Sequence, residues 1–359
     1  MFDRELNLLI ATCRSSYGGG PVAVGRFCEA VDWRHFLHLA RRHRVQALSW
    51  HGLGSSQGLA PTEIAEQLAA DTIAIVEANL RAAAECAQMK QQFDQAGVEL
   101  LFLKGLAVGA LAYPNPFLKM GWDIDVLVAP DTLGTAVNLL RSGGYLPAIP
   151  ASASDARLRR WHKSRKESVW HNAKLGIHLE LHTQLADHPG LLSGLGMQSP
   201  RQIVKVTDQI SLSTLAKDEL FAYLCVHGAS SAWFRLKWIT DLAAMLHREE
   251  PSEVDRLYIC SQRLGAGRAA AQALLLAQRL YGSPISAGLV QKLEAESANR
   301  WLANIACRQL ADPREPTERF LGTASIRLSQ LRLLPGVRFP LSEGFRQVQE
   351  IAGARLGWS

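Results

Sequence analysis

The chain has 359 residues, of which 48% are hydrophobic and 20% are charged. This length exceeds the usual size of one domain, so we expect two or three packed units, and the composition is that of a globular protein with a sizeable core. The excess of 39 Lys and Arg over 33 Asp and Glu gives a net charge of +6, which favours anionic partners such as nucleotides or nucleic acid.

Cysteine usage and the first residues indicate a cytoplasmic protein. The six cysteines are scattered, without a CxxC motif or a Cys-His cluster, which is typical of reduced thiols and not of a disulfide framework or zinc site. The chain starts Met-Phe-Asp-Arg-Glu, with acids where a signal peptide needs basic residues. No apolar run is long enough to span a bilayer, so we expect no membrane partner.

Residues 1–98 are expected to form an N-terminal helical region. An amphipathic stretch begins at Trp33, and a long segment rich in Ala and Glu begins at Pro61-Thr62. That segment contains no Gly or Pro before Gly97, which is a strong helix signal. We assign a packing role to this region.

The sequence pattern of residues 99–215 predicts a small α+β core. Two helices are expected, at 106–113 and at 131–142, the second ending at Gly143-Gly144. The expected strands are short apolar or alternating runs, at 98–103, 123–128, 168–171 and 177–182. The last two flank a turn-like Lys174-Leu-Gly176, so the core is predicted to be a mixed sheet with helices on one face.

Residues 216–359 are expected to be helical again. A helix that Asp218 can cap ends near His227-Gly228, and a second runs from about 232 to 247. Another is expected from Ala269 to Tyr281. The Pro- and Arg-rich residues past about 312 carry no secure assignment.

The most informative short motif is Asp123-Ile-Asp125. On a strand, side chains two positions apart share a face, so both carboxylates can converge on two hard cations about 3.5 to 4 Å apart. Ile124 then points into the core. Alone, such a pair is a weak signal, because two solvated acids at the start of a strand have the same pattern.

The surroundings of this pair strengthen the metal hypothesis. Lys104-Gly105 ends the preceding strand just before a short helix, and such a turn presents backbone N–H groups and a mobile positive charge to an anion. Glu180 lies in a later alternating strand, where a third carboxylate can complete a metal shell or act as a general base.

These motifs, in this order, resemble the polymerase-β-like nucleotidyltransferases. The likeness is closest to a bacterial branch of uncharacterised nucleotidyltransferases, some of which lie in lasso-peptide or other peptide-modification gene clusters. It covers most of the chain, from His43-Arg-Val to the helices between His227 and Leu246. Its most specific motifs are Leu103-Lys-Gly-Leu-Ala, Tyr113-Pro-Asn-Pro, Asp123-Ile-Asp-Val-Leu-Val and Leu179-Glu-Leu-His.

The resemblance implies a role for several of these residues. Gly105 matches the phosphate-contacting turn, Asp123 and Asp125 match the metal carboxylates, and Glu180 matches the third carboxylate. The turn departs from the superfamily, which has Gly-Ser or Gly-Gly where this chain has Lys104-Gly105, so Lys104 is expected to replace the missing serine contact to phosphate. The first aspartate also follows unusually late, eighteen residues after Gly105.

Several other residues allow two interpretations of their role. His178 and His182 share the strand face of Glu180, but three ligands spaced along one strand diverge too far for one zinc ion, so His182 is predicted to contact the nucleotide or a metal ligand. Lys237 and Asp241, four residues apart, form either a surface ion pair or, by analogy with the superfamily, a triphosphate contact through Lys237, with Arg235 a weaker candidate. The basic stretch 157–166 is either a clamp for a polyphosphate, RNA end or acidic peptide near the site mouth, or a solvated helix face.

The resemblance thus predicts an enzyme that transfers NMP from an NTP, such as ATP, to an acceptor hydroxyl or other nucleophile and releases pyrophosphate. Two Mg²⁺ ions held by Asp123, Asp125 and Glu180 would be its cofactors. The acceptor is open among a peptide, a small molecule and RNA, and a catalytically silent nucleotide- or peptide-binding protein is the alternative. The sequence does not identify the base or the oligomeric state.

Overall fold

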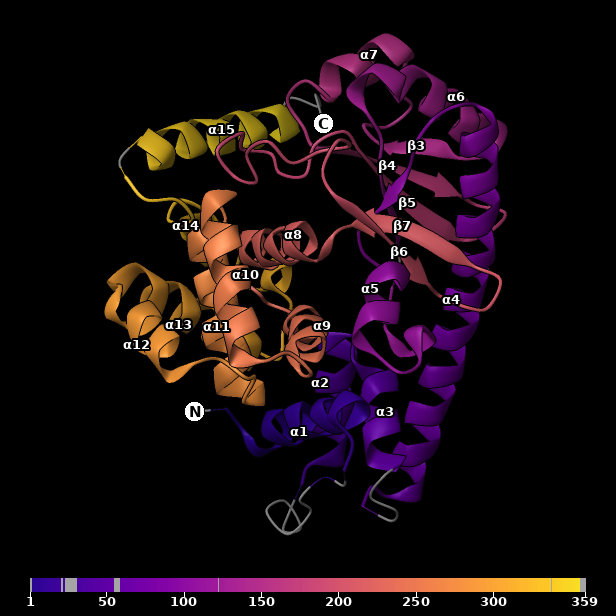
Figure 1. Cartoon of the computed structure of the whole chain (residues 1–359). Coiled ribbons are helices and arrows are strands. Elements are labelled where there is room, and N and C mark those ends of the chain that lie inside the picture. Colours follow the sequence, from indigo (N-terminus) through magenta and orange to yellow (C-terminus); the bar gives the residue numbers. More distant parts are fainter. Residues whose placement is uncertain are drawn as a thin grey trace.

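The computed structural model describes residues 2–20, 22, 31–54, 59–121, 123–336 and 338–355, with side chains described as far as residue 348. In Figure 1 a helical half and a half that carries the sheet lie side by side, and the long helix α4 (Thr62–Gln95) runs along the outer side of the sheet. The predicted α+β class is confirmed.

The N-terminal helices follow local sequence signals. Asp3 and Asp32 accept backbone hydrogen bonds at the starts of α1 and α2, as capping residues do. Helix α4 is uninterrupted because its 34 residues include neither Gly nor Pro. The three helices before it are α1 (Arg4–Gly18), α2 (Trp33–His43) and α3 (Gln46–Gly54).

A five-stranded mixed sheet forms the centre of the other half. Its order is β1-β2-β5-β4-β3, with β2 and β5 parallel and the other neighbours antiparallel. The strands are β1 (Leu101–Phe102), β2 (Asp123–Leu127), β3 (Leu146–Ile149), β4 (Glu167–Asn172) and β5 (Ile177–His182). The predicted hairpin between β4 and β5 is confirmed, with Gly176 in the left-handed region at φ 65°.

The helices of the core are α5 (Leu106–Ala112), α6 (Leu133–Ser142) and α7 (Asp155–Trp161), with 3-10 turns η2 (Pro116–Leu118) and η3 (Pro130–Thr132). A separate hairpin, β6 (Arg201–Lys205) and β7 (Ser211–Leu215), was not predicted. Nor was β3, whose side chains are mostly exposed and which contains Pro147. β3 and β6 lack the buried apolar pattern from which the others were predicted, whereas β7 is a short strand that buries Leu212 and Leu215.

The C-terminal part is helical, as predicted. Its elements are α8 (Lys217–Ser230), α9 (Leu236–Leu246), α10 (Pro251–Arg263), α11 (Gly267–Tyr281), α12 (Ala287–Ala295), α13 (Ser297–Ala311), η4 (Pro316–Glu318), α14 (Ala324–Gln330) and α15 (Arg338–Arg355). None of the helices described is long and apolar enough to cross a membrane.

Two apolar cores divide the molecule differently from the chain order. One joins the N-terminal helices α1–α3 to the C-terminal helices, for example Leu9 with Ile239 and Leu274. The other lies between one sheet face, including Val126 and Leu179, and the helices α4 and α6. Asp125 and Glu180 lie on the opposite sheet face, where Leu127 belongs to the first core.

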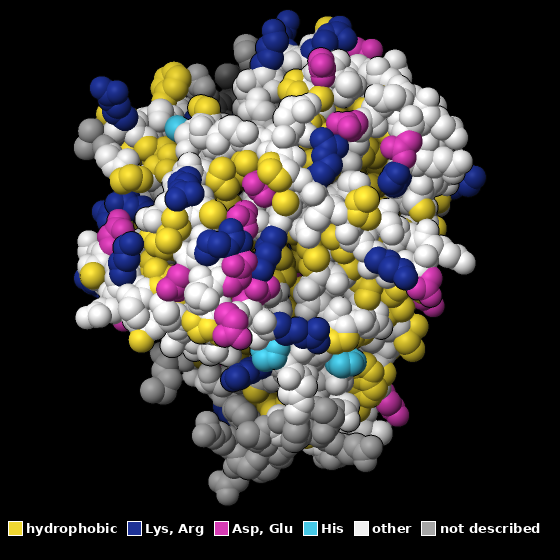
Figure 2. All heavy atoms as spheres, viewed as in Figure 1, with side chains coloured by type: hydrophobic (Ala, Val, Ile, Leu, Met, Phe, Trp, Pro, Cys, Tyr) yellow, Lys and Arg dark blue, Asp and Glu magenta, His cyan; other side chains and the backbone are white. Residues whose placement is uncertain are grey.

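Surface charge shows no large patch of one sign in the view of Figure 2, where basic and acidic side chains are interspersed. The excess of positive charge in the sequence is thus not displayed as a basic stripe on this face. The five cysteines that the structure describes have free thiols, and Cys28 lies outside the described residues.

Candidate active site

The parallel pairing of β2 with β5 brings the acidic motifs together. Asp125 lies opposite Glu180 in the register of the two strands, and Asp123 lies opposite His178. Ile124, by contrast, is buried in the core on the other face of the sheet. The alternation of a strand therefore puts carboxylates on one face and apolar side chains on the other.

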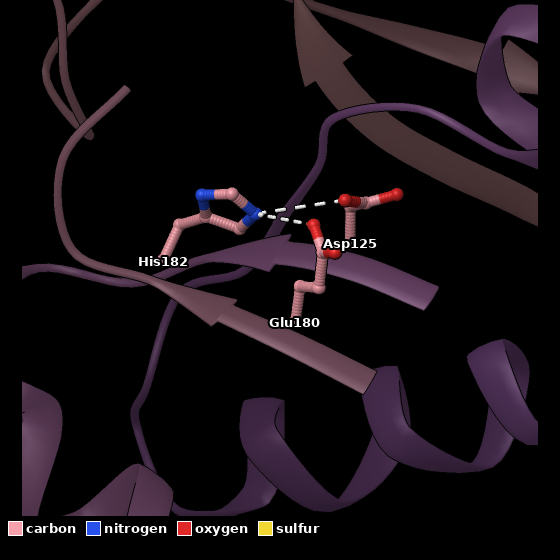
Figure 3. A group of neighbouring side chains, drawn as sticks. All are labelled: Asp125, Glu180 and His182. Atoms are coloured by element: carbon pink, nitrogen blue, oxygen red, sulfur yellow. Dashed lines mark ion pairs between the residues drawn. The ribbon is translucent and has the colours of Figure 1, made fainter. Parts of the chain in front are cut away.

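Asp125, Glu180 and His182 point toward one another (Figure 3). One potential ligand atom from each lies within 4.8 Å of the others. The imidazole Nε2 of His182 is 3.5 Å from Asp125 Oδ1 and 3.4 Å from Glu180 Oε2. His182 is fully buried, and neither of its ring nitrogens makes a hydrogen bond of good geometry with a described protein atom.

Lys104 supplies a positive charge to these acids. Its Nζ lies 2.5 Å from Asp125 Oδ1 and 3.3 Å from Glu180 Oε2. Burial, together with Glu180 and Asp123, raises the pKa of Asp125 to about 7 despite this ammonium group. Burial alone would raise the pKa of Glu180 as well, but Lys104 and His182 hold it well below its ordinary value.

Gly105 and Asp123 form the entrance beside this group. Gly105 has φ 58° and ψ −126°, a conformation open almost only to glycine, and it immediately precedes α5. A Cβ atom at this position would lie 3.7 Å from the carbonyl oxygen of Asp123, so the turn runs close along the start of β2. Asp123 and Asp125 line the same two cavities.

A cavity of about 200 Å³ between the sheet and the C-terminal helices is lined by both acids and cations. Besides Asp123, Asp125 and Glu180, its charged side chains are Arg44, Lys104, Lys119, Arg235, Lys237 and Asp241. Five cationic side chains therefore share this small space with four carboxylates.

Lys237 is half-buried and lines this cavity, so it does not lie on the open surface. Burial and the nearby Lys119 lower the pKa of Lys237 to about 7. The ion-pair alternative for Lys237 and Asp241 is wrong, since Asp241 is buried and bonds elsewhere, to Lys119 Nζ at 3.3 Å and to the Tyr113 hydroxyl at 2.7 Å.

The model of a family described as uncharacterised nucleotidyltransferases matches residues 29–282, which is more than half of the chain. The chain belongs to this family. No curated protein and no solved structure matches it. The family assignment agrees with the order of motifs that suggested it.

Three charged residues of this nucleotidyltransferase site were not predicted from sequence. Arg44 enters the cavity from the end of α2, and Lys119 from the loop before β2. Glu167, at the start of β4, lies opposite His182 in the register, 3.3 Å from its Nε2. A signal for Glu167 was available, because it immediately precedes the extended stretch predicted at 168–171.

The structure separates the two histidines of β5. His178 stacks against His171 of β4 at the exposed end of the sheet, with ring centroids 4.4 Å apart, and does not join the carboxylates. His182, two positions beyond Glu180, does join them. The group of potential metal ligands therefore combines Glu180 and His182 of β5 with Asp125 of the neighbouring strand β2.

The basic stretch 157–166 reaches the site only at its last residue. Arg157, Arg159, Arg160 and Lys163 are exposed on and after α7. Lys166, which pairs with Glu167, lines a third cavity of about 230 Å³ together with Glu180. The exposed residues of this stretch therefore lie on a solvated face, which was the second of the two alternatives.

Proposed function

We propose that this nucleotidyltransferase moves NMP from an NTP to an acceptor hydroxyl or other nucleophile. The acceptor oxygen would form a bond to the α-phosphorus, the bond from that phosphorus to the bridging oxygen would break, and pyrophosphate would leave. The observation that supports this best is the meeting of the carboxylates of β2 and β5 at the wall of a cavity lined by five cations.

The donor set suits Mg²⁺. Asp125 and Glu180 offer carboxylate oxygens that converge within 4.8 Å, and Asp123 is two positions away on the same strand face. Mg²⁺ prefers one or two protein carboxylates together with substrate phosphates. When bound, the metal would polarise the α-phosphate and stabilise the charge that develops there. We propose Asp123, Asp125 and Glu180 as its ligands, with two ions expected.

Lys104 and His182 would have supporting roles. The Lys104 ammonium lies against the same carboxylate oxygens that a metal would use. We propose that Lys104 turns to the nucleotide phosphates when metal binds, since no serine is present at the Gly105 turn. His182 would hold the carboxylates in position through its Nε2.

Glu180 fits a metal ligand better than a proton acceptor. Its pKa is held well below the ordinary value by Lys104 and His182, and a carboxylate of low pKa is a poor base. The acceptor proton would then pass to solvent or to a group of the acceptor itself.

The acceptor would approach from the third cavity. This cavity shares Glu180 and His227 with the cationic cavity, and α14 and α15 contribute Gln330 and Glu343 to its lining. Its volume of about 230 Å³ suits a small molecule or the end of a longer chain. Among its side chains the acids outnumber Lys166 and Arg346, so a neutral or cationic acceptor is favoured over a phosphorylated one.

The test is Mg²⁺-dependent transfer of label from α-³²P NTPs to RNA, peptides and small molecules. Asp125→Asn is expected to abolish transfer while the protein stays folded. Asp208→Asn, at a highly exposed ion pair with Lys205, is the matched control and should be fully active. Full activity of the Asp125 variant would show that the carboxylate assignment is wrong. Nucleotide binding without any transfer would favour a catalytically silent protein, and label confined to RNA would favour an RNA nucleotidyltransferase.

A further inference from the structure

We propose that the cavity beside helix α4 holds the sugar and base of the nucleotide, and that it accepts different bases with little discrimination. This inference rests on the proposed function and adds the position and the specificity of the nucleoside. The cavity has a volume of about 320 Å³ and lies between α4, the Gly105 turn and the hairpin of β4 and β5.

The wall of this cavity is mainly apolar. Helix α4 contributes small side chains at helical spacing, Ala74, Ala78 and Ala82, whose size leaves the space open. Opposite them lie larger apolar side chains, which are Phe102, Leu106, Ile124, Ile177 and Leu212. Such a wall suits the flat apolar faces of a nucleobase.

The cavity adjoins the cationic one at the carboxylates. The two share five lining residues, Lys104, Gly105, Gly121, Asp123 and Asp125. An NTP likewise carries its charge at one end, and at the other end it has a base with flat apolar faces. With its triphosphate among the cations and its α-phosphate at the carboxylates, the next part of the molecule, the nucleoside, would extend beside α4.

The third cavity is a poorer place for the nucleoside. It shares only Glu180 and His227 with the cationic cavity and is lined mostly by polar and charged side chains. A base placed there would also occupy the space from which an acceptor must reach the α-phosphate. The apolar cavity is on the other side of Asp123 and Asp125 and leaves that approach open.

Among the lining side chains that the structure describes, few can form hydrogen bonds with the edge of a base. Asn79 uses its Nδ2 to donate to the carbonyl oxygens of Phe117 and Lys119, at 2.7 and 2.8 Å. Arg81 lies exposed at the rim. Strong discrimination requires buried polar groups that a wrong ligand leaves unpaired, and the described lining side chains offer little of this.

Binding of non-transferable nucleotides provides the test. The α,β-methylene analogues of ATP, GTP, CTP and UTP, and inorganic tripolyphosphate, would be titrated with Mg²⁺ into the wild-type chain by calorimetry. Ala78→Phe fills the cavity from α4. Ala84→Phe, an exposed position of the same helix outside the described cavities, is the matched control.

The four analogues are expected to bind the wild type within about 5-fold of one another, and about 10-fold or more tightly than tripolyphosphate, because each base buries apolar area. Ala78→Phe should remove most of the extra affinity for the analogues and keep the affinity for tripolyphosphate within about 2-fold of wild type. Ala84→Phe should change neither affinity.

Several results would overturn the inference. One is that Ala78→Phe binds the analogues as tightly as wild type does. Another is that Ala78→Phe loses as much affinity for tripolyphosphate as for the analogues. A preference of 100-fold or more for one base would overturn the claim of low discrimination. If wild type bound neither kind of probe, the proposed function would fail along with the base pocket. If it bound tripolyphosphate as tightly as the analogues, only the base pocket would fail.

Discussion

Replacement of Lys104 by Met tests whether the site is built for a cation. The ammonium group of Lys104 lies 2.5 Å from Asp125 and 3.3 Å from Glu180, and all three side chains are largely shielded from water. Methionine keeps much of the length and volume but removes the charge. The two carboxylates would then repel each other in a buried place without compensation.

The burial of these groups determines how much the free energy of unfolding is expected to fall in Lys104→Met. At an effective dielectric constant of about 20, a pair of unit charges at 2.5 Å attracts by roughly 7 kcal/mol, much of which the desolvation of both groups cancels. Removal of one partner from a buried ion pair typically costs about 3–5 kcal/mol. Uptake of a proton by Asp125, whose pKa burial raises to about 7, limits the loss, so we expect about 3 kcal/mol near pH 8.

Urea unfolding at pH 8, with and without Mg²⁺, measures this effect. Mg²⁺ should stabilise Lys104→Met more than wild type, because lysine no longer competes for the same oxygens. Lys90→Met, at the exposed Lys90–Asp94 pair of α4, is the control and should change the free energy of unfolding by less than about 0.5 kcal/mol, with or without metal. A Lys104 variant as stable as wild type without metal, or one that Mg²⁺ does not stabilise further, would refute the reasoning.

Three further predictions concern stability and anion binding. Burial and the adjacent Arg42 lower the pKa of His43 to about 3. Because the unfolded chain takes up this proton first, near pH 6.5, stability should fall as pH drops below 6.5, by about 2 kcal/mol at pH 5. A urea series over pH 5–7.5 in which His43→Asn loses as much as wild type would contradict this. Gly228→Ala should cost about 1–3 kcal/mol, because the new Cβ would lie 2.5 Å from the ring of the buried Trp233; unchanged thermal unfolding would contradict the packing. Lys237→Gln should weaken tripolyphosphate binding about 10-fold at pH 6.5 and by less at pH 8.5, where Lys237 of the free wild type, with a pKa of about 7, has lost its charge. If this is wrong, calorimetry at both pH values would show the same difference in tripolyphosphate affinity between Lys237→Gln and wild type.

The strands that frame the site were predicted from local pattern. The apolar and alternating runs at 123–128 and 177–182 correspond to β2 and β5, and the hairpin turn at 174–176 is where it was expected. A buried strand leaves this pattern because each second side chain must be apolar. The mostly exposed β3 and β6 leave no such pattern, and for that reason they were not predicted.

The charged lining of the site was less accessible to sequence reasoning. Lys119 and Arg44 meet Lys237 in one cavity although they come from separate parts of the chain. Nothing in the residues next to Lys119 marks it, since a loop lysine is also common on the surface. Arg44 lies in the His43-Arg-Val motif of the family resemblance, but the motif did not predict that its side chain lines the site. That these side chains share one cavity depends on how the helical regions pack against the sheet.

By itself the sequence determined the α+β class, the family, and the two acidic strands, because strand periodicity, helix breakers and motif order are properties of neighbouring residues. Only the tertiary structure decided which side chains share one space. The parallel register of β2 and β5 placed Asp125 opposite Glu180 and near His182, and the packing of helices from both ends of the chain put Lys237 beside Lys119 and Arg44. Such meetings depend on contacts between residues far apart in the chain, which no local pattern encodes.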